Sequence, residues 1–311
     1  MSFPEEKVTV PGLKARKFTG EKISALTAYD YPSGLVADEA GMDVILVGDS
    51  LANTVLGYEN TLPVTLEEML IALRAVKRAV KRALLVADMP FGTYQCGSEQ
   101  ALAAGIAFVK AGAEAVKLEG GKKRAALVHE LVTNDIPVMG HIGLTPQSVH
   151  ALGGYRVQGK SPEDAEGLLE DAQELERAGA FAIVIEGVPS SLGEAITSRV
   201  EVPTLGIGAG LRCDGQILVF ADLLGLTPQR KPRFVRQYLD FHALALEAIR
   251  AYRADVRSGS FPSPAESYEL GAARTVKGKP SPRWRSATEI ADDQKEHHQA
   301  AYDPRHGGVS S

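Results

Sequence analysis

Residues 44–50 read VILVGDS, a run of four aliphatic residues followed by a glycine and an aspartate. A short aliphatic run of this kind is typical of a strand that is buried on both faces, as the strands of a parallel sheet are. The pattern recurs along the chain at residues 23–26, 83–86, 115–118, 136–139, 182–185, 204–207 and 216–219. The sequence therefore predicts eight buried strands.

Helical patterns lie between these strands. Thr65-Leu66-Glu67-Glu68 forms a capping box, in which the threonine hydroxyl and the last carboxylate satisfy free donors of a first helical turn. Ser161 and Pro162 begin a second helix, and Gly179 ends it. An alanine–glycine pair precedes a strand in a weak repeat, at residues 40–42, 111–113 and 178–180. The chain thus alternates between helix and strand.

Eight strands that alternate with helices over about 250 residues predict a (β/α)8 TIM barrel. The main alternative is a doubly wound open sheet, which usually has fewer strands and often a glycine-rich phosphate loop after the first. The first strand is followed instead by Thr27-Ala28-Tyr29-Asp30, which is no such loop. We therefore expect one α/β barrel domain that covers residues 1–271.

The last part of the chain has two characters. From about Pro232 the apolar residues have helical spacing, which predicts C-terminal helices of the same domain. Residues 272–311 are rich in Pro, Ser, Lys, Arg and Gln, and we expect them to form a disordered tail. We interpret the histidines in this tail as part of a solvated polar segment and not as a metal site.

Composition excludes several classes of protein. The formal net charge of −5 argues against a nucleic-acid binder, which normally carries a basic face. Two cysteines, Cys96 and Cys213, do not make a disulfide framework and indicate a reducing compartment. The chain shows neither a signal peptide nor an apolar run long enough to span a bilayer. These features predict a cytoplasmic protein without membrane or nucleic-acid partners.

An ionisable residue ends five consecutive predicted strands. In parallel α/β folds the carboxyl ends of the strands open onto one mouth, where reactive groups gather. One acid after a strand usually caps a helix or begins a turn, but this explanation is harder to apply to five residues at one rim. The five residues are Asp49, Asp88, Glu119, His141 and Glu186.

Four carboxylates at one mouth would repel one another, and a divalent cation would compensate for that repulsion. Oxygen ligands favour Mg²⁺, or else Mn²⁺, and there is no histidine–cysteine cluster that indicates zinc. We expect Asp49 and Asp88 to bind the metal directly, and Glu119 to bind it directly or through water. The sequence thus predicts a magnesium-dependent enzyme.

Two further polar residues belong to the same strands. Lys117 stands two positions before Glu119, so both side chains lie on the same side of the strand. A buried lysine needs a partner, and Lys117 either forms a structural ion pair or neutralises a substrate carboxylate or an enolate. His141 either hydrogen-bonds the substrate or orients Glu119, and both alternatives stay open.

Longer motifs surround these residues. The chain resembles the ketopantoate hydroxymethyltransferase (3-methyl-2-oxobutanoate hydroxymethyltransferase) family over about residues 8–268, and the strings GHIGLTPQS and GGYRVQG are the most specific matches. One departure is Glu266-Ser267-Tyr268, where the family usually has a histidine, which leaves the role of that segment open. The matching segments are residues 27–30, 47–51, 61–65, 87–91, 116–121, 140–148, 153–159, 206–210 and 213–216.

The resemblance implies a barrel of the phosphoenolpyruvate/pyruvate type with one Mg²⁺ per subunit, 5,10-methylenetetrahydrofolate as co-substrate, and a homodecamer. The implied reaction gives 2-dehydropantoate (ketopantoate) from 3-methyl-2-oxobutanoate through a Mg²⁺-stabilised enolate, in pantothenate and coenzyme A biosynthesis. The implied roles are metal binding for Asp49, Asp88 and Glu119, substrate binding for Asp49, Ser50, Asp88 and Lys117, and base catalysis for Glu186. We add His141 to the expected substrate-binding residues.

Two other functions remain alternatives at this level. One is a Mg²⁺-dependent α-keto acid lyase or mutase of the related barrel superfamily, which would use no folate. The other is a non-catalytic oligomer that binds a metabolite. We further expect the glycine- and glutamine-rich residues 142–160 to form a lid or a folate-facing loop, because they lack a clear helical pattern.

Overall fold

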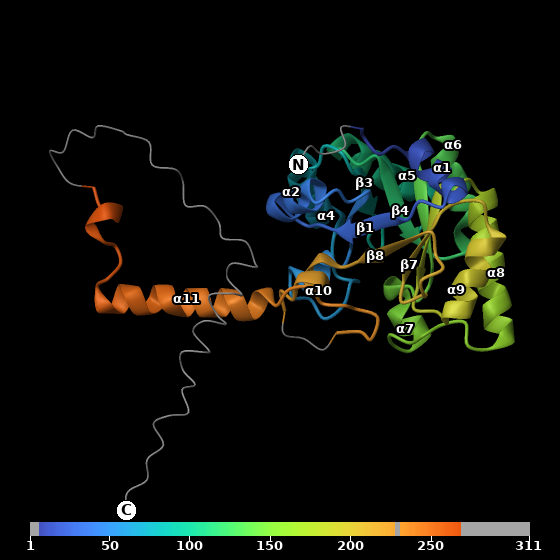
Figure 1. Ribbon diagram of the computed structural model, residues 1–311. Helices are drawn as coiled ribbons and strands as arrows, with labels where there is room; N and C mark the ends of the chain where they lie inside the picture. The colour runs from blue at the N-terminus through green and yellow to red at the C-terminus, as the bar shows by residue number, and fades with distance from the viewer. Residues whose placement is uncertain (1–5, 228–230, 269–311) are drawn as a thin grey trace, which may run out of the picture. The chain divides into compact units, whose positions relative to one another are not determined.

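Eight parallel strands close into a barrel, in which each strand pairs with the next and β8 pairs with β1 (Figure 1). The structure is a computed structural model that describes residues 6–227 and 231–268, so the expected tail at 272–311 lies outside the described residues. Closure of the sheet confirms the barrel and excludes the open doubly wound sheet. The strands are β1 (Ile23–Thr27), β2 (Val44–Val47), β3 (Leu84–Asp88), β4 (Ala115–Glu119), β5 (Val138–Gly143), β6 (Ala182–Glu186), β7 (Thr204–Ile207) and β8 (Gly215–Leu218).

Helices connect most of the strands. The α-helices are α1 (Val10–Thr19), α2 (Tyr31–Glu39), α3 (Leu51–Thr54), α4 (Leu66–Ala79), α5 (Ser98–Ala111), α6 (Ala125–Thr133), α7 (Val149–Leu152), α8 (Pro162–Arg177), α9 (Ser190–Arg199), α10 (Phe220–Leu224) and α11 (Phe241–Ser258). Short 3₁₀ helices are η1 (Lys122–Arg124), η2 (Pro146–Ser148) and η3 (Pro264–Glu266). None of the helices in the described ranges is both long and apolar enough to cross a bilayer.

The predicted helix signals act as expected. The Thr65 hydroxyl accepts the Glu68 amide at the start of α4, and the Glu68 carboxylate accepts the Thr65 amide in return. Ser161 caps α8 by accepting the Asp164 amide. Gly112 ends α5 with a φ of 109°, a left-handed conformation that glycine adopts without a steric penalty.

The barrel interior fixes the direction of the side chains at its mouth. Successive residues of a strand point to opposite faces. Leu84 and Val86 of β3 lie in the apolar cluster that fills the barrel, whereas Leu85 and Ala87 belong to the layer packed against the helices. Asp88, the next residue in phase with Val86, therefore points inward. The same alternation directs the last inward side chains of β4, β5 and β6 to the mouth.

The segment before α11 differs from expectation. The sequence predicts helix from about Pro232, but α11 begins at Phe241. The Tyr238 amide donates to the Leu223 carbonyl at 2.8 Å, and Phe234 lies so close to Gly208 that a Cβ there would be 2.6 Å from the ring. These contacts with the loop after β7 and with α10 replace the local hydrogen bonds of a helix.

The chain divides into two compact units, residues 1–250 and 251–311. The first unit contains the barrel. In the described part of the second, Tyr252 and Phe261 pack edge to face with their ring centres 5.3 Å apart. A boundary at residues 271 and 272 stays a prediction from composition.

The base of the barrel, at the amino ends of the strands, contains acids that bind a neighbouring strand. Asp43 precedes β2 and accepts hydrogen bonds from the amide and hydroxyl of Ser24 in β1, at 2.9 and 2.8 Å. Glu114 precedes β4 and accepts the amide of Leu85 in β3 at 2.9 Å. Each acid thus holds two adjacent strands together near their amino ends.

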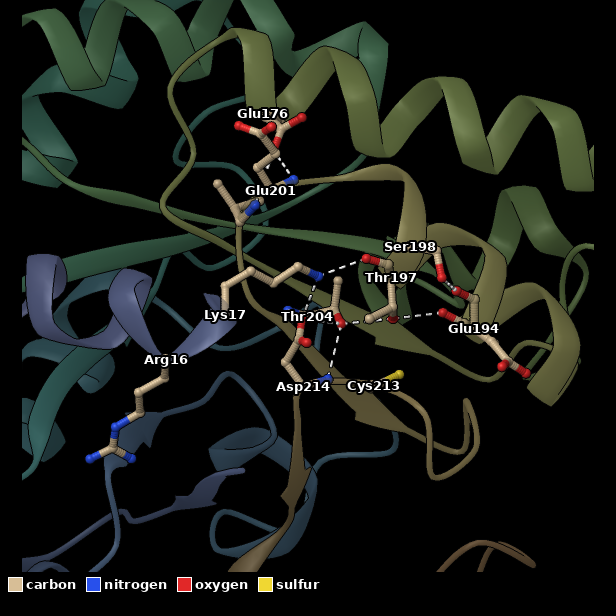
Figure 2. Close-up of polar contacts among 12 residues, drawn as sticks. Arg16, Lys17, Glu176, Glu194, Thr197, Ser198, Glu201, Thr204, Cys213 and Asp214 are labelled. Atoms are coloured by element: carbon tan, nitrogen blue, oxygen red, sulfur yellow. Dashed lines mark hydrogen bonds and ion pairs between the residues drawn. The ribbon is translucent and has the colours of Figure 1, made fainter. Parts of the chain in front are cut away.

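Asp214 does the same before β8 (Figure 2). Its Oδ2 accepts the amide and hydroxyl of Thr204 in β7, at 2.8 and 3.0 Å, and also the ammonium group of Lys17 at 2.8 Å. Lys17 donates a second bond to the Thr197 carbonyl at 2.6 Å, and the hydroxyls of Thr197 and Thr204 are 2.8 Å apart. One carboxylate therefore joins α1, α9 and the two strands β7 and β8.

Cations of the N-terminal segment pair with all three acids. Besides Lys17, Arg16 lies 2.8 Å from Asp43 and Lys7 lies 2.5 Å from Glu114. Leu13 of α1 is fully buried in the cluster that fills the barrel. The N-terminal segment thus closes the base by apolar packing and by what we call the basal network, which consists of Lys7, Arg16, Lys17, Asp43, Glu114 and Asp214.

Candidate active site

A cavity of about 600 Å³ opens at the carboxyl ends of the strands. All of the site residues predicted from the sequence line it, and apart from Ser50 and Glu186 they are buried. The strand phase brings Asp88, Glu119, His141 and Glu186 together, and Asp49 reaches the cavity from the turn after β2. The predicted residues are Asp49, Ser50, Asp88, Lys117, Glu119, His141 and Glu186.

Lys117 is the one lysine among these residues, and it pairs with Asp88. Its Nζ lies 2.8 Å from Asp88 Oδ1 and 3.4 Å from His141 Nδ1. The backbone amide of Asp49 donates to the other oxygen of Asp88, Oδ2, at 3.2 Å. The structural ion pair considered for Lys117 is therefore present, and the ammonium group also borders the cavity.

Crowding shifts the protonation of these groups. Burial, then repulsion by Asp88 and Glu119, raises the pKa of Asp49 well above its usual value. Burial also raises the pKa of Asp88, although Lys117 opposes the shift. Burial disfavours the charged form of Lys117, but the three neighbouring carboxylates outweigh that effect and raise the pKa of its ammonium group. Ionising every acid of the cluster is therefore unfavourable while Lys117 is the only lysine among them.

His141 lies between two acids. Its Nδ1 is 3.5 Å from Glu119 Oε1, and its Nε2 is 3.2 Å from Glu186 Oε2. Burial and the charge of Lys117 disfavour the protonated ring, but the contacts with Glu119 and Glu186 outweigh both and raise the pKa of His141 to about 9. A protonated His141 can therefore orient two carboxylates at once.

The donor set fits a hard divalent cation. Within the described residues, Glu119 Oε1 forms no hydrogen bond, and Asp88 Oδ1 has only its ion pair with Lys117. Buried carboxylate oxygens without donors are costly and suit an ion that prefers oxygen. No three acidic, histidine or cysteine side chains of the described chain converge closely enough to form a complete site. One or two carboxylates with water in the other positions is the usual arrangement for Mg²⁺.

Sequence reasoning missed a chain of hydroxyls behind Ser50. The Phe220 amide donates to the Thr27 hydroxyl at 2.9 Å, which donates to the Tyr29 hydroxyl at 2.8 Å. Tyr29 and Ser50 oxygens are 2.8 Å apart, and burial raises the pKa of Tyr29, so its proton is retained. Either oxygen of this pair can donate, and when Tyr29 donates, the Ser50 proton is free for a ligand. In the sequence, only the motif Thr27–Asp30 indicates these hydroxyls.

A second omission concerns Gln147 and Tyr94, which contact the acids from the loop after β5 and the loop after β3. Gln147 lies in η2, and α7 follows it. The expectation that residues 142–160 lack helix is therefore wrong at residues 146–152. Neither side chain is charged, so a search for charged residues at the strand ends does not find them. Only the motif GHIGLTPQS, which contains Gln147, indicates that this residue matters.

The outer part of the cavity has a different composition. It is lined by Tyr155, Arg156, Arg233 and Phe234, all of them exposed. Tyr155 is 54% exposed, and the partial burial of its ring, followed by repulsion from Asp49 and the other acids, raises its pKa. Aromatic and cationic groups at the rim, above an acidic floor, divide the cavity into two chemically distinct parts.

Comparison with known proteins identifies close sequence relatives. The model of a family described as ketopantoate hydroxymethyltransferase matches residues 7–264. A 3-methyl-2-oxobutanoate hydroxymethyltransferase of Koribacter versatilis (strain Ellin345) is 54% identical over 265 residues, which are 85% of this chain and 90% of the relative. The enzyme of the same name from Thermotoga maritima (strain ATCC 43589 / DSM 3109 / JCM 10099 / NBRC 100826 / MSB8) is 54% identical over 256 residues, 82% of this chain and 95% of the relative.

Solved structures with a similar fold are more distant in sequence. A phosphonopyruvate hydrolase in complex with oxalate and Mg²⁺ has a TM-score of 0.55 and 15% identity, with 96% of this chain and 98% of that chain covered. A 2,3-dimethylmalate lyase of the PEP mutase/isocitrate lyase superfamily has a TM-score of 0.52 and 15% identity, with 94% and 98% covered. At this identity the likeness shows the fold alone, and it agrees with the predicted phosphoenolpyruvate-type barrel.

Proposed function

Because the chain belongs to the ketopantoate hydroxymethyltransferase family, we propose that it transfers a hydroxymethyl group from 5,10-methylenetetrahydrofolate to 3-methyl-2-oxobutanoate. It is a transferase, and its product is 2-dehydropantoate, or ketopantoate, of pantothenate biosynthesis. The observation that carries the proposal is the acidic floor of the cavity, where Asp49, Asp88 and Glu119 surround Lys117.

We propose that Asp49 and Asp88 bind one Mg²⁺ per subunit, with Glu119 bound directly or through water. The oxygens of Asp88 and Glu119 that lack hydrogen bonds support this assignment. The metal would supply Lewis-acid polarisation of the keto oxygen of the substrate. Lys117 and Ser50 would hold the substrate carboxylate, because the ammonium group borders the cavity and the Ser50 proton is free to donate.

Glu186 is the proposed base. It ends β6, lines the cavity, and has 16% of its side chain exposed, so it can meet a substrate that the other acids hold. It would remove the proton from C3 of the keto acid, and the resulting carbon nucleophile would form a bond to the one-carbon unit of the folate. Water would supply the hydroxyl oxygen of the product, and the bond between that carbon and the folate nitrogen would break to release tetrahydrofolate. His141 would orient Glu186 and Glu119 through its two ring nitrogens.

The outer part of the cavity would take the folate. Tyr155 and Phe234 offer aromatic faces, and Arg156 and Arg233 offer charges that complement carboxylates. A volume of about 600 Å³ lies in the range of sites for drug-sized ligands and leaves room beside a small keto acid. We also propose that the protein is cytoplasmic and forms a homodecamer, which light scattering of the purified protein would test.

Proton exchange at C3 tests the proposal. In D₂O with Mg²⁺ and no folate, we expect the C3 hydrogen of 3-methyl-2-oxobutanoate to exchange, and we expect ketopantoate only after 5,10-methylenetetrahydrofolate is added; both are followed by proton NMR. Glu186→Gln should slow both processes by about 10²- to 10⁴-fold. The exposed Glu39→Gln serves as the control variant. Full turnover in Glu186→Gln would refute the assigned base, and product formation without folate would refute the donor.

A further inference from the structure

Gln147 is a neutral residue that contacts two acids of the cavity floor. It lies in η2, immediately after β5, and is 6% exposed. Its Nε2 donates to Asp49 Oδ2 at 2.9 Å and to the Met89 carbonyl at 3.0 Å, and its backbone amide donates to Glu119 Oε2 at 2.9 Å. A single neutral residue thus contacts groups that follow or end β2, β3 and β4.

Tyr94 fixes the orientation of the Gln147 side chain. The Tyr94 hydroxyl, also buried, donates to Gln147 Oε1 at 2.5 Å and accepts the backbone amide of Glu119 at 3.3 Å. The Met89 carbonyl can only accept a hydrogen bond, and the Tyr94 hydroxyl, which accepts the Glu119 amide, has its proton left to donate. The amide nitrogen must therefore face Met89, and a flipped amide would place its oxygen against that carbonyl.

The contacts divide the oxygens of each acid into two kinds. Asp49 Oδ2 and Glu119 Oε2 are each held by a Gln147 donor, and Asp88 Oδ2 is held by the Asp49 amide. The opposite oxygen of Glu119 has no hydrogen-bond partner in the described chain, and that of Asp88 has only its ion pair with Lys117. One oxygen of each acid is thus fixed by a hydrogen bond, and the opposite oxygen of Glu119 is left without one.

We propose that Gln147, locked by Tyr94, is a positioning residue that sets the orientation of Asp49 and Glu119 for the divalent cation. This inference rests on the proposed function, because it assumes that these acids bind the metal. Groups that orient metal ligands act on affinity without touching the metal, and their loss typically weakens binding by about 10- to 100-fold. Gln147 would therefore act through the acids and not on the substrate.

Two variants test the proposal by metal affinity. Gln147→Glu keeps the shape but places a carboxylate against Asp49, and we expect it to raise the dissociation constant for Mn²⁺ about 100-fold. Tyr94→Phe removes a single oxygen, frees the Gln147 amide to rotate, and should raise that constant about 10-fold. Mn²⁺ binding is followed by the EPR signal of the free ion, and circular dichroism establishes that each variant is folded.

Thr93→Val is the matched control. Thr93 precedes Tyr94, is similarly buried, and its hydroxyl donates only to the Pro90 carbonyl at 2.7 Å. Loss of this hydroxyl should leave Mn²⁺ affinity unchanged. The proposed role of Gln147 would be wrong if folded Tyr94→Phe and Gln147→Glu bound Mn²⁺ as tightly as the unmodified protein, or if Thr93→Val lost as much Mn²⁺ affinity as they do. Either result would leave the proposed metal site itself standing. Failure of the unmodified protein to bind Mn²⁺ would overturn the metal proposal as well.

Discussion

The two ends of the barrel use the same residue types in opposite ways. At the base, Asp43 and Asp214 each accept several hydrogen bonds and face a cation of the N-terminal segment. At the mouth, the acids outnumber Lys117, and two buried oxygens lack hydrogen bonds in the described chain. Satisfied carboxylates stabilise the fold, whereas crowded ones are costly and suit a ligand of opposite charge.

The protonation of the acids shows the same contrast. At the base, burial opposes the charge of Asp43, but hydrogen bonds from Ser24 and the Arg16 guanidinium outweigh it and lower the pKa of this carboxyl. At the mouth, burial and neighbouring acids raise the pKa of Asp49. We therefore expect removal of a charge at the base to destabilise the protein, and removal of an acid at the mouth to stabilise it while abolishing metal binding.

Lys117→Met should give the largest effect on stability. It leaves Asp88 buried without its cation, which should lower the free energy of unfolding by about 3–5 kcal/mol. Lys7→Met at the base breaks a pair whose side chains are 35% and 31% exposed, and it should cost about 1 kcal/mol or less. Urea denaturation of the metal-free proteins measures both. Equal losses of unfolding free energy in the two variants would show that ion pairs at the mouth and at the base contribute alike to stability.

Asp214→Asn should lower the free energy of unfolding by about 2 kcal/mol, because it weakens charge-assisted bonds to Thr204 and Lys17. We expect kcat to stay within about 2-fold of the unmodified enzyme, since Asp214 is at the opposite end of the strands. Urea denaturation and steady-state kinetics measure the two effects. Asp164→Asn, an exposed position in α8, is the control. A large loss of kcat in Asp214→Asn would mean that the base and mouth are coupled.

Asp49→Asn should act in the opposite direction. The amide keeps an acceptor for Gln147 and removes a charge that burial, Asp88 and Glu119 disfavour. We expect the metal-free protein to gain about 1 kcal/mol in the free energy of unfolding, measured in the presence of a chelator. Mn²⁺ binding should be lost in the same variant. A loss of stability instead would show that the mouth acids are not in mutual repulsion.

The fall in the free energy of unfolding at acid pH should depend on Asp43. Its pKa is lower in the folded protein than the usual 3.8, so the unfolded chain takes up the proton first as the pH falls. Its stabilising contribution is complete above that value and is lost as the pH falls through the folded pKa. Urea denaturation between pH 2 and 6 should show that the free energy of unfolding falls less steeply with pH in Asp43→Asn than in Glu39→Gln. The same dependence on pH in both variants would contradict the lowered pKa of Asp43.

The sequence predicted the mouth better than the base. Strand phase decides which way Asp88 and Glu119 point, and phase can be read from a few neighbouring residues. The basal network joins residues far apart in the chain, such as Lys17 and Asp214, and only closure of the barrel brings them together. Their charges looked like ordinary surface residues, so no local pattern indicated the contact.

Two other features escaped sequence reasoning for different reasons. Gln147 and Tyr94 are neutral, and their importance comes from donors and acceptors that only the folded loops align. The sequence predicts too early a start for α11, because Phe234 and Tyr238 have helical spacing but contact the loop after β7 and α10. Periodicity indicates which residues are apolar, and it does not identify what covers them.

The bond between Lys17 and Asp214 has a consequence for synthesis of the chain. The two residues are 197 positions apart, so Lys17 leaves the ribosome long before its partner is made. Contacts of such large separation form late, because the intervening chain must be ordered first. We therefore expect the N-terminal helix to be loosely held and open to proteases in nascent chains that stop before β8. Once β8 has left the ribosome and joined the barrel, the helix should become protected.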